Sequence, residues 1–215
     1  MTTDYKYAAF ISYKHLPQDA SAARRVQFLI ENCSRPSLLA DRKSLFTGVP
    51  KNPCFPSEYE YSGSDPLSEN IVEALAQAST LVVICSPDAK EDARILREIE
   101  TYIDLHESAR IIAFVSAGDP EDCIPDILLS KISATEGKAM QVDQPEVIVV
   151  DGRDGLLNRD CEEKSKLTGF ALGYSVEESL GKVRMNKRIN TAMLVTVVIL
   201  VVATFLTLPL YRFMI

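Results

Sequence analysis

Residues 80–103, TLVVICSPDAKEDARILREIETYI, decide the fold of this chain, because they read as a strand, a tight turn and a helix in succession. Thr80–Cys85 is apolar apart from the threonine and rich in β-branched residues. This composition is typical of a strand buried on both faces, as in a parallel sheet covered by helices. Ser86-Pro87 ends the strand, and three acidic residues between positions 88 and 92 favour the positive end of a helix dipole.

The helix that follows has two notable stripes. Leu96, Ile99 and Ile103 recur at three- and four-residue spacing, which predicts an apolar face packed against a core. Arg94, Glu98 and Tyr102 lie four residues apart on a neighbouring stripe. The unit therefore carries one carboxylate, Glu98, within the helix.

The rest of the chain repeats this alternation of strands and helices. Further strands are predicted at Tyr7–Ser12, Pro53–Pro56, Arg110–Val115 and Val147–Val150. Helices are predicted from an Asp19 cap to about Asn32, from Asp65-Pro66 to about Ala78, over Ile124–Leu128, and weakly from Gly155 to about Leu172. Such alternation predicts an α/β fold, a flavodoxin-like parallel five-stranded sheet with helices on both faces and right-handed crossovers.

In sheets of this kind, ligands bind beyond the carboxyl ends of the strands, where the turns between strands and helices gather. Three turns are candidates: Ser12–Pro17, Ser57–Asp65 and Ser86–Ala89. Glu98 belongs to this rim only if its helix lies against it.

Composition excludes several classes of function. The net charge of -7 and pI near 5.0 argue against nucleic acid as a partner, which needs a positive field. Five scattered cysteines without a CxxC pair, and only two histidines, predict no metal site and suit a reducing compartment. The chain has no GxGxxG, no GxxxxGK[ST] and no GxSxG, which argues against nucleotide-binding Rossmann units, P-loop enzymes and α/β-hydrolases.

The C-terminal part predicts a membrane anchor. Residues 191–210, TAMLVTVVILVVATFLTLPL, form an uncharged stretch long enough to cross a bilayer. Four basic residues between positions 182 and 188 precede it, and Arg212 alone follows, so the N-terminal domain is expected on the cytoplasmic side of a single-pass membrane protein. A buried core helix is the alternative. We therefore divide the chain into a domain at 1–174, a basic juxtamembrane segment at 175–190, a transmembrane helix at 191–210 and a short tail at 211–215.

The domain resembles the TIR (Toll/interleukin-1 receptor) domain in its bacterial form. The resemblance rests on YAAFISYKH followed by a helix, a polar loop closing on SDPLSENIVEALAQAS, and TLVVICSPDAKEDARILREIE, in that order. It covers roughly Tyr5 to Tyr174. It implies cleavage of NAD⁺ at the nicotinamide–ribose bond, with NAD⁺ as substrate and no cofactor, or non-catalytic assembly with other TIR domains.

By position, the resemblance makes Glu98 the catalytic residue, which would hold the ribose hydroxyls and stabilise positive charge as nicotinamide leaves. Ser12, Tyr13 and Ser86 are candidate substrate-binding residues, although serines at these places also serve as turn formers and helix caps. The exposed loop residues Tyr59 and Tyr61 are candidate interface residues for self-association or for a partner TIR domain.

Two features depart from the family pattern. Pro56–Glu60 stands where related sequences carry arginine and aspartate, and Arg94 stands where an aromatic residue is usual, four positions before the glutamate. An Arg94–Glu98 pair at this spacing is also what a simple surface ion pair would give. Two functions remain open: a membrane-tethered NAD⁺ hydrolase activated by self-association, and a membrane scaffold that recruits other TIR domains.

Overall fold

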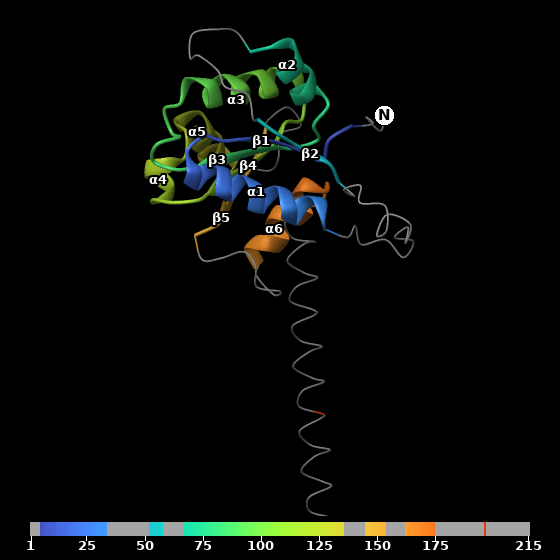
Figure 1. Ribbon diagram of the computed structural model, residues 1–215. Coiled ribbons are helices and arrows are strands. Elements are labelled where there is room, and N and C mark those ends of the chain that lie inside the picture. The colour runs from blue at the N-terminus through green and yellow to red at the C-terminus, as the bar shows by residue number, and fades with distance from the viewer. Residues whose placement is uncertain are drawn as a thin grey trace, which may run out of the picture.

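The structure, a computed structural model, describes residues 5–33, 52–57, 67–135, 145–153 and 162–174, together with Thr196. Strands and helices alternate along these residues (Figure 1). In chain order they are β1 Ala9–Ser12, α1 Pro17–Glu31, β2 Cys54–Pro56, α2 Glu69–Ala76, β3 Leu81–Cys85, α3 Ala93–Leu105, β4 Arg110–Val115, α4 Pro120–Cys123, α5 Asp126–Thr135, β5 Glu146–Asp151 and α6 Glu162–Ala171.

The strands form one five-stranded sheet in the order β2-β1-β3-β4-β5, and every neighbouring pair is parallel. This is the strand order of flavodoxin-like, doubly wound sheets. The predicted α/β class and the five-stranded parallel sheet are confirmed. The order reverses between β1 and β3, so their carboxyl ends flank the position where ligands bind in such sheets.

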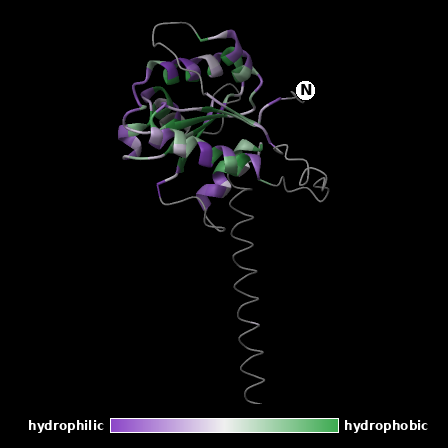
Figure 2. Ribbon diagram, in the orientation of Figure 1, coloured by the Kyte–Doolittle hydropathy of each residue, from purple (hydrophilic) through white to green (hydrophobic). Residues whose placement is uncertain are grey.

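Helices cover both faces of the sheet (Figure 1). α1 and α6 pack on one face, and α2, α3 and α5 pack on the other. The side chains of β3 are apolar on both faces of the sheet because each face is covered by helices. Leu81, Val83 and Cys85 belong to the core on the α3 face, and Val82 and Ile84 belong to the core on the α1 face. Figure 2 shows the result, with hydrophobic strands in the middle and hydrophilic residues on the outer sides of the helices.

Two helix starts differ from the prediction. Asp19 does not cap α1: the helix begins at Pro17, and Asp19 is its third residue, fully buried. α2 begins at Glu69 rather than at Asp65-Pro66, because Ser68 is extended and its carbonyl accepts the first backbone bonds of the helix. Ser68 is therefore the N-cap.

The buried face of α3 also differs from the predicted stripe. Asp92 caps the helix, and its carboxylate accepts from the N–H groups of the second and third helical residues. Leu96 and Ile103 are only half-buried. The side chains that the helix buries are Arg94, Ile95, Glu98, Ile99 and Tyr102. The hydrophobic spacing predicted a different buried face because two of these five side chains, Arg94 and Glu98, are of charged types.

Among the described residues, no helix is long and apolar enough to cross a membrane. The predicted juxtamembrane segment, the predicted transmembrane helix at 191–210 and the tail lie outside the described residues, except for Thr196. These assignments stay predictions.

Gly152, directly after β5, gives a test of the core on the α1 face. A Cβ added there would lie 2.1 Å from Cζ of Phe114, a fully buried ring. We expect G152A to lower the free energy of unfolding by about 2–3 kcal/mol, because the ring must move. Urea unfolding followed by circular dichroism measures this.

F114L removes the clashing ring edge, so the double variant should lose about 1 kcal/mol less than the sum of the single variants. Strict additivity of the two losses would show that the ring is not what excludes a side chain at position 152.

Candidate functional site

Glu98 is fully buried at the carboxyl-end edge of the sheet. Each of its carboxylate oxygens accepts one serine hydroxyl: Ser12 Oγ donates to Oε2 at 2.5 Å, and Ser57 Oγ donates to Oε1 at 2.8 Å. Both serines are themselves fully buried. α3 thus lies against the rim, which is the condition that the sequence set for Glu98 to belong to it.

The backbone explains why these groups meet. Ser12 ends β1 and Ser57 directly follows β2, and these strands are neighbours in the sheet. Because side chains alternate along a strand, Ser12 points to the same face as Phe10, which is the face covered by α3. α3 runs back from this edge, so Glu98, one and a half turns from its start, lies over the ends of both strands.

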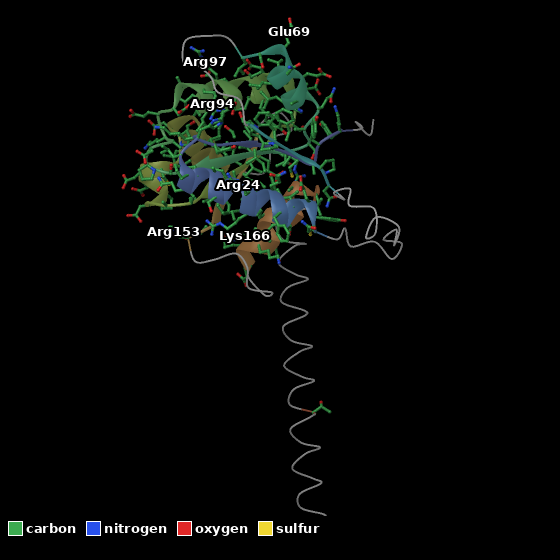
Figure 3. All side chains as sticks on the ribbon, viewed as in Figure 1. Arg24, Glu69, Arg94, Arg97, Arg153 and Lys166 are labelled. Atoms are coloured by element: carbon green, nitrogen blue, oxygen red, sulfur yellow. The ribbon has the colours of Figure 1, made fainter. Side chains whose placement is uncertain are left out.

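Arg94 lies one turn before Glu98 and is also buried. Its Nη2 donates to the backbone carbonyl of Tyr13, and its Nη1 lies 2.9 Å from Nε2 of His15 and 3.5 Å from Ser57 Oγ. Figure 3 shows Arg94 on the sheet side of α3, whereas Arg97 projects from the outer side. The interpretation of Arg94 and Glu98 as a surface ion pair is wrong, because both side chains are buried and no ion pair joins them.

Burial dominates the electrostatics of Glu98. Removal from water raises the pKa of its carboxyl above the usual 4.5, and the Ser12 hydroxyl, the Arg94 charge and the Ser57 hydroxyl oppose this without cancelling it. The Asp92 charge adds a smaller contribution in the raising direction. Ionising a carboxyl group in this environment costs free energy. Groups whose pKa is shifted in this way concentrate at functional sites.

A second buried carboxylate lies on the other face of the same edge. Asp19 Oδ2 accepts from Ser86 Oγ at 3.0 Å, and Asp19 Oδ1 accepts from Ser116 Oγ at 3.3 Å. These serines directly follow β3 and β4. Burial raises the pKa of Asp19 above its usual 3.8, although both hydroxyls lower it.

Four neighbouring strands thus have a serine at their carboxyl end or directly after it, and these serines donate to buried carboxylates, two to Glu98 and two to Asp19. This role of Asp19 was not predicted, because its position in the sequence is equally typical of a helix cap. A signal was present: an apolar run followed at once by serine recurs at Ile11-Ser12, Cys85-Ser86 and Val115-Ser116.

The predicted site residues separate into three groups. Ser12 contacts Glu98 directly, and Tyr13 reaches the site through its carbonyl on Arg94, while its ring stacks on His15 at 5.0 Å between centroids. Ser86 is not brought to Glu98, since its hydroxyl donates to Asp19 on the α1 face. Tyr59 and Tyr61, the predicted interface residues, lie outside the described residues.

No group of three or more His, Cys, Asp or Glu side chains in the described part of the chain is arranged to hold a metal ion. Comparison with known proteins identifies no relative: no protein-family model, no curated protein and no solved structure matches the chain. The chemistry of the site therefore has to be argued from its own residues.

The site contains a carboxylate, Glu98, whose two oxygens are held by hydroxyl donors and which lies near the guanidinium of Arg94. Such a group can accept hydrogen bonds from hydroxyls of a ligand in place of the serines. It can also stabilise a developing positive charge, because it is fixed in a site from which water is excluded.

We expect E98Q to stabilise the fold at neutral pH, because the amide keeps the shape of the side chain and removes a buried charge. The pKa of Glu98 is higher in the folded state than in the unfolded state. The stability that the protonated Glu98 contributes is therefore fully present below the unfolded pKa and is lost as pH rises through the folded pKa. The gain from E98Q should therefore be largest near neutral pH and vanish below about pH 4.5.

The measurement is urea unfolding of both proteins across this pH range. Glu100, two residues further along and exposed, supplies the control E100Q, because this substitution makes the same chemical change without removing a buried charge. Destabilisation by E98Q at every pH would mean that the charge of Glu98 serves stability.

Proposed function

We propose that this protein is a membrane-anchored TIR-domain signalling or defence protein that hydrolyses NAD⁺ at the nicotinamide–ribose bond when it self-associates. The observation that carries the proposal is the position of Glu98: a carboxylate on α3, fully buried, placed over the carboxyl ends of β1 and β2. The sequence resemblance selects the same residue. The site also lies beside the topological switch point between β1 and β3, where doubly wound sheets bind their ligands.

In the proposed reaction, Glu98 accepts hydrogen bonds from the ribose hydroxyls and faces the ribosyl carbon as the bond to nicotinamide breaks. The electron pair of that bond leaves with nicotinamide, which departs neutral, and positive charge develops on the ribose. A fixed carboxylate favours that charge more than it favours the ground state, which is the requirement for catalysis. Water then adds to the ribosyl carbon and loses a proton, giving ADP-ribose.

Substrate cannot reach Glu98 in the state described here, because the carboxylate is fully buried beneath Ser12, Ser57 and Arg94. The contact between Arg94 and the carbonyl of Tyr13 has to open first. Self-association is a natural source of the required free energy, since a chain confined to a membrane meets its copies at high effective concentration.

The same burial favours the alternative function, a non-catalytic scaffold that recruits other TIR domains at the membrane. In that case Glu98 and its two serines only join α3 to the sheet. The two functions differ in one measurable property, the consumption of NAD⁺.

If residues 191–210 cross the bilayer with the domain on the cytoplasmic side, protease added outside intact cells should leave residues 5–174 uncut. The physical reason is the excess of basic residues before the segment, which retains that flank in the cytoplasm. Western blotting against the domain measures this, with permeabilised cells as the control. Digestion in intact cells would reverse the topology.

We expect the full-length protein, embedded in membranes and clustered, to consume NAD⁺, and E98Q to be slower by about a hundredfold or more. Loss of a charge that stabilises the transition state typically costs about 3 kcal/mol. Release of nicotinamide measures the rate. A wild-type protein that consumes no NAD⁺ even when clustered would leave the scaffold function.

The two serine pairs supply a matched control. S12A removes a hydroxyl from Glu98 and S86A removes one from Asp19, so both should lower the free energy of unfolding by about 1–3 kcal/mol. Only S12A should reduce NAD⁺ cleavage beyond this effect on folding. Equal losses of activity in S12A and S86A would argue against a specific role for the Glu98 site.

A further inference from the structure

Arg94 is a buried cation without an anionic hydrogen-bond partner. The residue is 8% exposed, and the contacts of its guanidinium are the carbonyl of Tyr13, the imidazole of His15 and the hydroxyl of Ser57. None of the ion pairs among the described residues includes it. A guanidinium has five N–H donors, so three contacts to neutral groups leave part of its capacity unused.

The position of Arg94 in α3 adds positive charge where the helix is already positive. It is the second residue of the helix, and a cation in the first turn is unfavourable to the helix dipole. The arginine therefore does not serve the stability of α3. A guanidinium and the positive end of a helix together favour an anion.

His15 cannot hydrogen-bond to both Arg94 and Ser57 through the same ring nitrogen. Nε2 of His15 lies 2.6 Å from the carbonyl oxygen of Ser57 and 2.9 Å from Nη1 of Arg94. One ring nitrogen cannot donate to the carbonyl and accept from the guanidinium at once, so one of these contacts is not a hydrogen bond. His15 itself is exposed, which places this incompletely bonded corner next to solvent.

We propose that Arg94 and His15 form an anion site that binds a phosphate oxygen of the substrate. In the described state, the carbonyl of Tyr13 occupies the place of that oxygen. A phosphate group is a stronger acceptor for a guanidinium than a neutral carbonyl, so its binding would release the Tyr13 loop and expose Glu98.

The negative groups nearby limit the direction of approach. Glu98 lies one turn further along α3 and Asp92 caps the helix, so the anion would enter from the Tyr13–His15 side. The assignment of the substrate as NAD⁺, whose pyrophosphate would supply the anion, rests on the proposed function. The anion site itself rests on the geometry.

Isothermal titration of the full-length protein in detergent with inorganic pyrophosphate tests the site. The wild type should bind pyrophosphate at millimolar concentrations, and R94Q should bind it about ten- to a hundredfold more weakly, the cost of losing a charged hydrogen bond. Arg97, on the outer side of the same helix, supplies the control R97Q, which should bind as the wild type does (Figure 3). R94K keeps the charge but loses the planar fork and should lie between.

Failure to bind pyrophosphate in the wild type, or equal binding in R94Q or R94K and the wild type, would overturn the anion site. R94K keeps the test open if R94Q does not fold. The kinetic counterpart is the ratio of kcat/KM for NAD⁺ to that for nicotinamide riboside, which lacks phosphate. R94Q should lower this ratio about tenfold or more, whereas a purely structural defect would lower both values alike.

The two proposals fail separately. Pyrophosphate binding that depends on Arg94, without any NAD⁺ consumption, would keep the anion site and reject the hydrolase. NAD⁺ consumption with an unchanged substrate ratio and unchanged pyrophosphate binding in R94Q would keep the hydrolase and reject the anion site.

Discussion

The structure depends on the burial of two carboxylates at the ends of its strands, each satisfied by two serine hydroxyls. Ionising a carboxyl in a protein interior is expensive, and two hydroxyl donors recover only part of the lost hydration. The raised pKa values of Glu98 and Asp19 are the sign of that imbalance. The serines also join α3 to β1 and β2, and α1 to β3 and β4. The sheet is therefore held at one edge, once on each face, by a carboxyl group whose burial disfavours its charged form.

The two carboxylates share this geometry but differ in their neighbours. Arg94 lies one turn from Glu98 and contributes a positive charge that favours the ionised form, and its contacts lead outward to the exposed His15. The positive charge that acts on Asp19 is that of Lys14, and it lowers the pKa of Asp19 less than either serine hydroxyl does. Glu98 thus has a charged partner that connects it to the surface. This asymmetry supports the proposal that the chemistry belongs to Glu98 rather than to Asp19.

Much of the architecture was predictable because it follows from patterns that a linear chain displays directly. The apolar run of Leu81–Cys85 is typical of a strand covered on both faces, and its alternation with helices favours a parallel sheet. The buried face of α3 was not predictable from hydropathy, because Arg94 and Glu98 count as polar and shift the apparent stripe toward Leu96 and Ile103. The pairing of Ser86 with Asp19 was equally hidden, since it joins residues 67 positions apart. The position of a buried polar side chain depends on its hydrogen-bond partner. That partner can be identified only when the order of the strands in the sheet is known.

The two edges of the sheet limit how copies of this chain can meet. β2 has three residues and includes Pro56, which has no N–H to donate, so this edge offers little backbone for an added strand. At the other edge, the amide of Asp151 at the end of β5 already donates to the carboxylate of Glu163 on α6. Continuation of the sheet from one molecule into the next is therefore disfavoured at the β2 edge, and at β5 it would compete with the bond between Asp151 and Glu163. Copies that meet at the β2 side would do so through side-chain surfaces of helices and turns, whose contacts are reversible and open to regulation, rather than through a shared backbone ladder.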